Sequence, residues 1–230
     1  MKVFIIADLH GNLDRYREAF EVCKNMGCQE LWLAGDLLPH IPTKTLEEYT
    51  YAQSKFWDTE LVPILRQSQL VIRGFPGNDD VPGGTYDTDG ILYTVPTLVT
   101  IHNKQVLFNP YLQHRDWHLW REIEVSSYSN IVVPMVSQAD IIITHQPPLG
   151  YLDTVYDDCG YKYIGSRIMR DVLLERARYS VNCIHCYFGH NHGQAGERMI
   201  HDNVEYHNVC VVKNISNGVV LDLDTMKTCR

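Results

Sequence analysis

Long apolar runs alternate with polar segments along the chain, and the runs predict buried strands. Residues 2–7 and 140–144 are continuous in β-prone side chains, which is typical of strands with both faces covered. Other β-prone runs occupy residues 30–34, 70–74, 91–95, 98–101, 105–108, 183–188, 204–212 and 218–223. We expect residues 91–108 to form sequential antiparallel strands with a tight turn at residues 102–104.

Three segments between these runs have the apolar spacing of helices. Asn12 can cap a helix that Gly27 stops, and its apolar positions are Leu13, Tyr16, Phe20 and Cys23. Residues 43–66 also predict a helix, with Pro63 as a break or kink. Ser166 can cap a third helix that ends near residue 178. Its core-facing positions are Ile168, Val172 and Leu173.

Polar side chains follow five of the predicted strands at the point where each strand ends. They are Asp8, His10, Asp36, Asn78, His145, His190 and His192. Because ligands bind at the carboxyl ends of strands in open α/β sheets, we expect one shared cleft. Two divalent ions that share a carboxylate need about this many oxygen and nitrogen donors, with positions left for water and substrate.

Composition and charge narrow the class of protein. The 230 residues are 45% hydrophobic and 21% charged, so we expect one globular domain over residues 1–230. A net charge of -8 argues against polymeric nucleic acid or an anionic membrane as the main partner. A small phosphate ester stays open, because bound metal ions would dominate the local field.

Cysteine content and the length of the apolar runs bear on location. Seven cysteines, an odd number, do not resemble a secreted disulfide framework, so we expect reduced thiols and a cytoplasmic protein. No apolar run reaches the length of a signal sequence or a membrane span.

Three further segments contain residues that are common in binding sites, but we interpret them as structural. Cys183-x-x-Cys186, with His185 between the two, suggests zinc, but residues 183 and 186 of a strand face opposite ways and cannot chelate together. Residues 109–121 are rich in aromatic side chains and histidine, and we expect them to pack against the sheet. Those residues are Tyr111, His114, Trp117, His118 and Trp120. Residues 81–89 predict a loop at the rim of the cleft.

The strand-end residues resemble the motif series of the calcineurin-like metallophosphoesterases. The motifs are Asp8-x-His10, Gly35-Asp36, Gly77-Asn78, His145 and Gly189-His190-x-His192, in that order. The resemblance implies a four-layer αββα sandwich of two mixed sheets with helices outside. It implies that one metal is held by Asp8, His10 and His192, the other by Asn78, His145 and His190, and that Asp36 bridges them. The two divalent ions would be Mn, Fe, Zn or Ni, with Mn favoured.

Within this superfamily, residues 144–150, with residues 109–111 upstream, most resemble the metallophosphoesterase-domain-containing branch. That branch is similar to the class III cyclic-nucleotide phosphodiesterases. The resemblance implies that a hydroxide bridging the two metals attacks phosphorus in line, with Asn78 also donating to the phosphate. Similar phosphodiesterases are commonly dimers, so a homodimer stays open. The substrate-binding residues are not identified.

The chain departs from the family at Asp79, where the usual residue is a histidine thought to protonate the leaving group. A carboxylate beside two cations should be ionised, so Asp79 is a poor proton donor and repels a phosphomonoester dianion more than a diester monoanion. We therefore expect a dimetal phosphodiesterase for a small, nucleotide-type substrate. Two other roles stay open: Asp79 as a metal ligand, and His40 as the source of the proton.

Two other functions remain as alternatives. A phosphomonoesterase or protein phosphatase is disfavoured, because residues 35–40 lack the acid-arginine-glycine continuation of the serine/threonine phosphatases. A non-catalytic protein-binding scaffold on the same fold is disfavoured by the intact set of metal donors, although the change at Asp79 is consistent with it.

Overall fold

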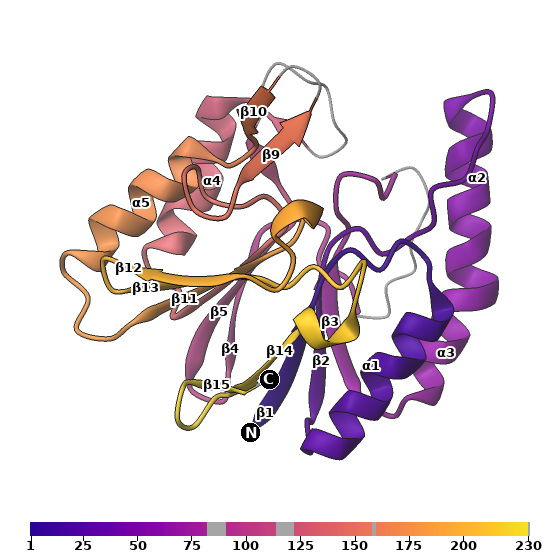
Figure 1. Ribbon diagram of the computed structural model, residues 1–230, viewed down its shortest axis with the longest axis horizontal. Helices are drawn as coiled ribbons and strands as arrows, with labels where there is room; N and C mark the ends of the chain where they lie inside the picture. Colours follow the sequence, from indigo (N-terminus) through magenta and orange to yellow (C-terminus); the bar gives the residue numbers. More distant parts are fainter. Residues whose placement is uncertain (82–90, 114–121, 158–159, 230) are drawn as a thin grey trace.

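Two stacked β-sheets form the centre of the molecule, and helices cover both outer faces (Figure 1). The computed structural model describes residues 1–81, 91–113, 122–157 and 160–229. The loop expected at residues 81–89 therefore lies, apart from Val81, outside the described residues. The same holds for His114, Trp117, His118 and Trp120, whereas Tyr111 packs against the core of the second sheet as expected.

The first sheet has the order β15-β14-β1-β2-β3. Its strands are β1 (Lys2–Ile6), β2 (Glu30–Ala34), β3 (Val71–Phe75), β14 (Val219–Asp222) and β15 (Lys227–Cys229). Strands β1, β2 and β3 are parallel to one another. β14 pairs antiparallel with β1, and β15 pairs antiparallel with β14, so the sheet is mixed.

The second sheet has the order β12-β13-β11-β8-β5-β4. Its strands are β4 (Thr97–Ile101), β5 (Lys104–Asn109), β8 (Ile141–Thr144), β11 (Ile184–Phe188), β12 (Arg198–His201) and β13 (Val204–Asn208). The four central strands are parallel and the two edge strands antiparallel.

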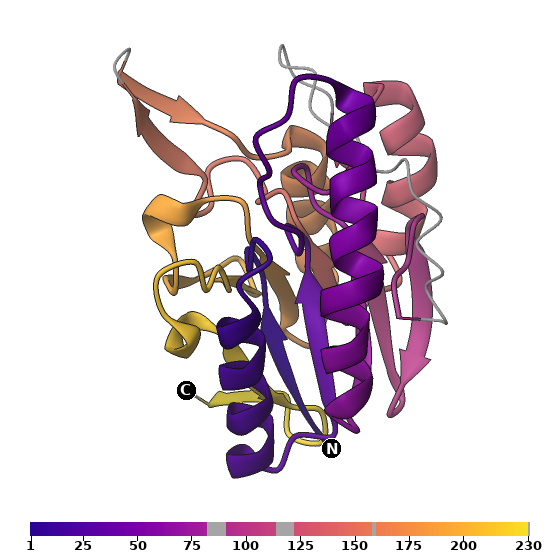
Figure 2. The same ribbon diagram turned by 90° about the vertical axis from the view of Figure 1, so that its right-hand side faces the viewer.

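Two small ladders complete the described strands. One joins β6 (Leu112–Gln113) to β7 (Glu122–Ile123), and the other joins β9 (Thr154–Asp157) to β10 (Gly160–Tyr163). The β9–β10 hairpin projects from the body of the molecule (Figure 2).

Helices cover the outer face of each sheet (Figure 1). The first sheet carries α1 (Leu13–Met26), α2 (Leu46–Phe56), a π-helix (Trp57–Leu61) and α3 (Val62–Gln67). The second carries α4 (Val125–Val136) and α5 (Arg167–Ala177). Two 3-10 turns lie at His192–Gln194 and Ile215–Asn217. These layers confirm the αββα sandwich of two mixed sheets.

The layering follows from strands that are apolar on both faces. Val3 and Ile5 of β1 pack between the two sheets, whereas Phe4 and Ile6 pack against the helices outside the first sheet. Each fully buried side chain of this kind contributes about 1.5–3 kcal/mol. A run with no polar position is therefore what a strand at the centre of a four-layer stack requires.

Local signals in the sequence account for several boundaries. The Asn12 side chain accepts a hydrogen bond from the Arg15 backbone N–H, and Gly27 ends α1 with a φ of 67°. Ser166 caps α5 through the N–H of Met169. The helical run expected at residues 43–66 is interrupted just before Pro63: a π-helix ends at Leu61, and Pro63 lies in the first turn of α3, where its missing N–H is tolerated.

The strand expected at residues 91–95 is wrong. Leu92 forms only one isolated bridge, to Gly74 of β3. The next strand, β4, belongs to the other sheet, and Pro96 directly before it has no N–H to extend a ladder. The expected turn at residues 102–104 is confirmed, since His102 and Asn103 have φ values of 50° and 62° between antiparallel β4 and β5. No helix in the described ranges is long and apolar enough to cross a bilayer.

Candidate metal centre

The residues after β1, β2 and β11 turn sharply, and these turns bring polar side chains together. Asp8, His10, Asp36 and His190 all have positive φ values, between 45° and 67°. Such backbone is strained for residues other than glycine, and strain of this kind collects at functional sites. Backbone hydrogen bonds hold the turns in place: the Asp8 N–H donates to the Gly35 carbonyl, and the His10 N–H to the Asp36 carbonyl.

Two glycines allow the carboxylates to approach the neighbouring loops. A Cβ at Gly77 would overlap the Asp36 carboxylate, and a Cβ at Gly189 would overlap that of Asp8. The glycines of the Gly77-Asn78 and Gly189-His190 motifs are therefore required by close packing against acidic side chains.

One group of donors consists of Asp8, His10 and His192. His192 Nε2 lies 3.1 Å from Asp8 Oδ1 and 3.3 Å from His10 Nε2. Asp8 is fully buried and also accepts from the His190 backbone N–H. The structure thus brings side chains from residues 8–10 and 190–192 into one cluster.

A second group consists of Asn78, His145 and His190. His145 Nε2 lies 2.8 Å from Asn78 Oδ1, and its Nδ1 donates to the Ala34 carbonyl over 2.9 Å. That second hydrogen bond fixes the ring with Nε2 toward the cluster. The His190 ring lies beside it, with centroids 5.1 Å apart.

Asp36 lies between the two groups. Its Oδ2 is 3.3 Å from His145 Nε2 and 4.0 Å from His10 Nε2. All seven side chains expected at the strand ends therefore meet in one place, although they come from positions as far apart as 8 and 192.

Comparison with known families identifies the chain. The family model described as calcineurin-like phosphoesterase matches residues 1–194. The chain belongs to the calcineurin-like phosphoesterase family. A search of curated protein sequences gave no match.

Solved structures agree with the fold of this family. A dimetal phosphatase from Danio rerio has a TM-score of 0.61 at 10% identity, over 96% of this chain and 91% of that one. TT1561 of Thermus thermophilus has a TM-score of 0.57 at 13% identity, over 99% and 96% of the two chains. Another crystal structure reaches 0.70 at 15% identity, over 99% and 97%.

The donors fit the dinuclear metal site of the calcineurin-like phosphoesterases. Ligand atoms of Asp8, Asp36 and His145 lie within 4.8 Å of one another, and so do those of His10, Asp36 and Asp79. Among the described residues, the ion pairs of Asp8 and Asp36 are all with histidines. Buried carboxylates whose ion-pair partners are imidazoles have the composition of a site for divalent cations.

The protonation of the two buried histidines differs because of their neighbours. Burial would lower the pKa of His145, but the Asp36 carboxylate beside it raises that pKa to about 10. Burial and then repulsion from His145 lower the pKa of His190 to about 4. Burial would raise the pKa of Asp36, yet the charge and hydrogen bond of His145 hold it well below its usual range. Without metal, His145 and Asp36 therefore form a buried ion pair.

Asp79 lies at the edge of this phosphoesterase site. Its Oδ1 accepts from Asn78 Nδ2 over 2.7 Å, its Oδ2 is 3.8 Å from His10 Nδ1, and its N–H donates to Asp36 Oδ1. The side chain is 37% exposed. Burial and then the Asp36 charge raise the pKa of Asp79 in the absence of metal.

Asp80 was not identified as a site residue from the sequence, yet it links the two loops that carry Asp36 and Asn78. This fully buried carboxylate accepts hydrogen bonds from the backbone N–H groups of Leu37, Leu38 and Gly77. It thereby fastens the loop after β3 to the loop after β2. Burial and the Asp36 charge raise its pKa to about 7. The sequence singled out Asp79 and gave no sign that the carboxylate next to it is buried and binds backbone N–H groups.

Cys210 was also missed. Its sulfur lies within 4.8 Å of ligand atoms of Asp8 and His192, and the residue is fully buried. It follows β13 within residues 204–212, a run that predicted only strand. A cysteine in an apolar run looks like a core residue, and only the bridge between Ala7 and Cys210 places it at the site.

Proposed function

We propose that the chain is a metal-dependent phosphodiesterase for a small, nucleotide-type diester. In this proposal Asp8, His10 and His192 hold one divalent cation, Asn78, His145 and His190 hold the other, and Asp36 is shared. The observation that supports it most is the place of the Asp36 carboxylate, with one oxygen 3.3 Å from His145 Nε2 and 4.0 Å from His10 Nε2. A single oxygen between two donor groups suits a shared ligand.

Two bound cations, with Mn²⁺ favoured, would supply an ionised water and neutralise charge on the phosphoryl oxygens. The chain's own residues orient the reaction. Asn78 keeps its oxygen on His145 and its amide nitrogen 2.7 Å from Asp79, so the amide is fixed at the edge of the cluster. The positive-φ turns at Asp8 and Asp36 hold both carboxylates before any ligand arrives.

Asp79 favours a diester over a monoester. Its carboxylate lies beside His10 and Asn78, where a phosphoryl group would enter, and it is too acidic to protonate a leaving group when cations are bound nearby. An ionised carboxylate repels a dianion more than a monoanion. The proposal therefore includes leaving groups that depart without a proton.

A phosphomonoesterase is the second candidate, and a contact of His40 favours it. The Tyr49 hydroxyl lies 3.4 Å from His40 Nδ1 and 3.4 Å from the Asp79 carbonyl oxygen. Gln53 Nε2 donates to the same hydroxyl and to the same carbonyl. This arrangement keeps an imidazole beside Asp79, and that imidazole could supply the proton which Asp79 does not.

Two substrates with the same leaving group distinguish the candidates. Initial rates would be measured on bis(p-nitrophenyl) phosphate and p-nitrophenyl phosphate, with the metal-loaded protein and with His40→Gln. The diesterase proposal predicts a larger kcat/KM for the diester, and little change on the diester in His40→Gln. A strong preference for the monoester would replace the proposal with the second candidate.

A further inference from the structure

Cysteine, histidine and glutamate side chains converge at the amino end of β11, away from the phosphoesterase site. One ligand atom each of Cys183, His185 and Glu205 lies within 4.8 Å of the others. His185 is 3% exposed and Glu205 7%, whereas Cys183 is partly exposed. His190 and His192 follow the carboxyl end of the same strand. Five residues of strand separate the two ends by roughly 15 Å.

The register between β11 and β13 brings the side chains of this cluster together. β11 pairs in parallel with β13, and His185 is directly opposite Glu205 on the same face. Cys183 precedes the first strand residue and joins them from the side. Cys186 packs instead in the core on the outer face of the sheet, so Cys183 and Cys186 do not form a pair. The ligand set is therefore not the Cys-x-x-Cys that the sequence suggests.

The spacing within the cluster suits two ligands of one cation. His185 Nδ1 lies 3.7 Å from Glu205 Oε2, which is too far for a hydrogen bond. Tetrahedral Zn²⁺ with bonds of about 2.0–2.2 Å to nitrogen and oxygen separates such atoms by about 3.4 Å. The Tyr187 hydroxyl is 3.4 Å from the same nitrogen and can hydrogen-bond to it when no metal is present.

The other oxygen of Glu205 is held by its neighbours. His207 Nε2 lies 2.6 Å from Glu205 Oε1, and the Arg198 guanidinium lies 2.8 Å from the same atom. These contacts fix the carboxylate with Oε2 toward His185. Partners that orient a ligand in this way are typical of metal sites.

The types of ligand in the cluster select the kind of cation. Burial lowers the pKa of His185, so its imidazole is neutral and can bind a metal. A thiolate, an imidazole and a carboxylate together suit Zn²⁺, which prefers sulfur and nitrogen, over Mg²⁺, Ca²⁺ or Mn²⁺.

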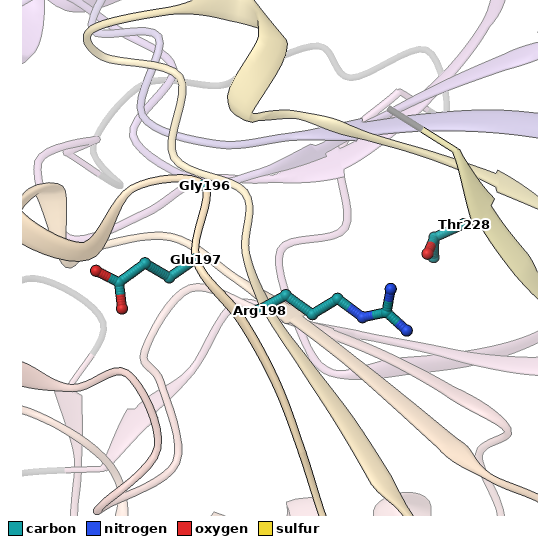
Figure 3. Close-up of a pocket in the computed structure, with 4 residues that line it drawn as sticks. All are labelled: Gly196, Glu197, Arg198 and Thr228. Carbon is teal, nitrogen blue, oxygen red and sulfur yellow. The ribbon is translucent and has the colours of Figure 1, made fainter.

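A surface pocket lies beside this region. It has a volume of about 440 Å³ and is lined by Gly196, Glu197, Arg198 and Thr228. Figure 3 shows the Arg198 side chain extended toward Thr228 of β15, while Glu197 points the opposite way. Arg198 lines this pocket and also contacts Glu205, so the pocket lies next to the carboxylate of the cluster.

We propose that Cys183, His185 and Glu205 form a second, separate metal site that binds Zn²⁺, with water as the fourth ligand. The ion joins the segment before β11 to β13. The site is structural and does not depend on the phosphoesterase activity proposed above.

Cobalt titration of the full-length, chelator-stripped protein tests the site. Thiolate ligation gives Co²⁺ a charge-transfer absorption band that nitrogen and oxygen ligands do not give. The wild-type protein should develop the band with one equivalent bound in this mode, and Zn²⁺ should abolish it. Cys183→Ser should lose it, whereas Cys186→Ala should keep it.

The thiol of Cys210, beside Asp8, requires a control of its own. The band should persist in Cys210→Ser. A band that is absent from wild type, or that survives in Cys183→Ser and vanishes in Cys210→Ser, would overturn the proposal. A measurement on wild-type protein alone adds a second test: Zn²⁺ should slow maleimide labelling of Cys183, mapped by mass spectrometry, at least tenfold. Unchanged labelling at saturating Zn²⁺ would equally overturn it.

Discussion

The change of Asp79 to asparagine should raise activity on monoesters. Asp79→Asn keeps an amide oxygen to accept from Asn78 Nδ2, and it keeps the backbone N–H that donates to Asp36, so the loop geometry is retained. The variant removes the negative charge whose Oδ2 lies 3.8 Å from His10 Nδ1. Any change in rate then reports mainly on charge.

The size of the effect follows from Coulomb's law. Two unit charges 4 Å apart repel by about 1 kcal/mol in bulk water and by about 4 kcal/mol at an effective dielectric constant of 20. Because Asp79 is 37% exposed, solvent screens the interaction, and we take the low part of this range, about 1–2 kcal/mol. A monoester dianion carries one more charge than a diester. The ratio of kcat/KM for monoester to diester should therefore rise roughly 5- to 30-fold.

The assay compares p-nitrophenyl phosphate with bis(p-nitrophenyl) phosphate at one pH and one metal concentration. Asp58→Asn, which removes an exposed carboxylate within the π-helix, is the matched control and should leave the ratio unchanged. A ratio that stays within twofold of wild type in Asp79→Asn would refute the electrostatic account. A loss of metal binding in the variant would show that Asp79 is a ligand.

Three further predictions concern the loops that hold the site. Asp80→Ala leaves three buried backbone N–H groups without their acceptor and should lower the free energy of unfolding by about 3 kcal/mol or more, measured in urea; a loss below about 1 kcal/mol would contradict this role. Gly189→Ala should weaken Mn²⁺ binding at least tenfold in calorimetry, because the new Cβ overlaps the Asp8 carboxylate. The control Gly193→Ala, whose new Cβ has its nearest contact at 3.3 Å, should bind Mn²⁺ as wild type does. Equal affinities in the two variants would show that packing at Gly189 does not position Asp8. The pKa of His145 is raised from 6.5 to about 10, so its ion pair stabilises chelator-stripped protein fully below about pH 6.5, and this contribution is lost as the pH rises toward 10. The Tm of wild type should therefore fall over that pH range, and the Tm of His145→Gln should change less. Parallel curves of Tm against pH for the two proteins would count against the ion pair.

Much of the fold could be predicted because its signals are local. Strands apolar on both faces, the Asn12 and Ser166 caps and the Gly27 stop each depend on neighbouring residues alone. Helix α4 was not predicted, since its β-branched residues and Pro134 are poor helix formers and packing against α5 decides its conformation. The strand expected at residues 91–95 failed for a similar reason: the chain leaves one sheet for the other there.

Some residues of the candidate site could also be predicted from the sequence, and others could not. Residues at strand ends could be listed from the sequence, because parallel strands bring their carboxyl ends to one edge. The structural role of Asp80 could not, since it depends on which backbone N–H groups surround the buried carboxylate. Cys210 and the cluster of Cys183, His185 and Glu205 needed the pairing of distant strands.

Metal content and activity measured in the same samples test the central claim most directly. Mn²⁺ would be titrated into chelator-stripped protein in a Cys183→Ser background, which removes a ligand of the proposed zinc site, and hydrolysis of bis(p-nitrophenyl) phosphate would be followed at each step. The account predicts that activity rises as the second equivalent binds, and that Asp36→Asn abolishes both the second equivalent and the activity. Full activity of folded, metal-free protein, or two tightly bound ions in Asp36→Asn, would contradict it.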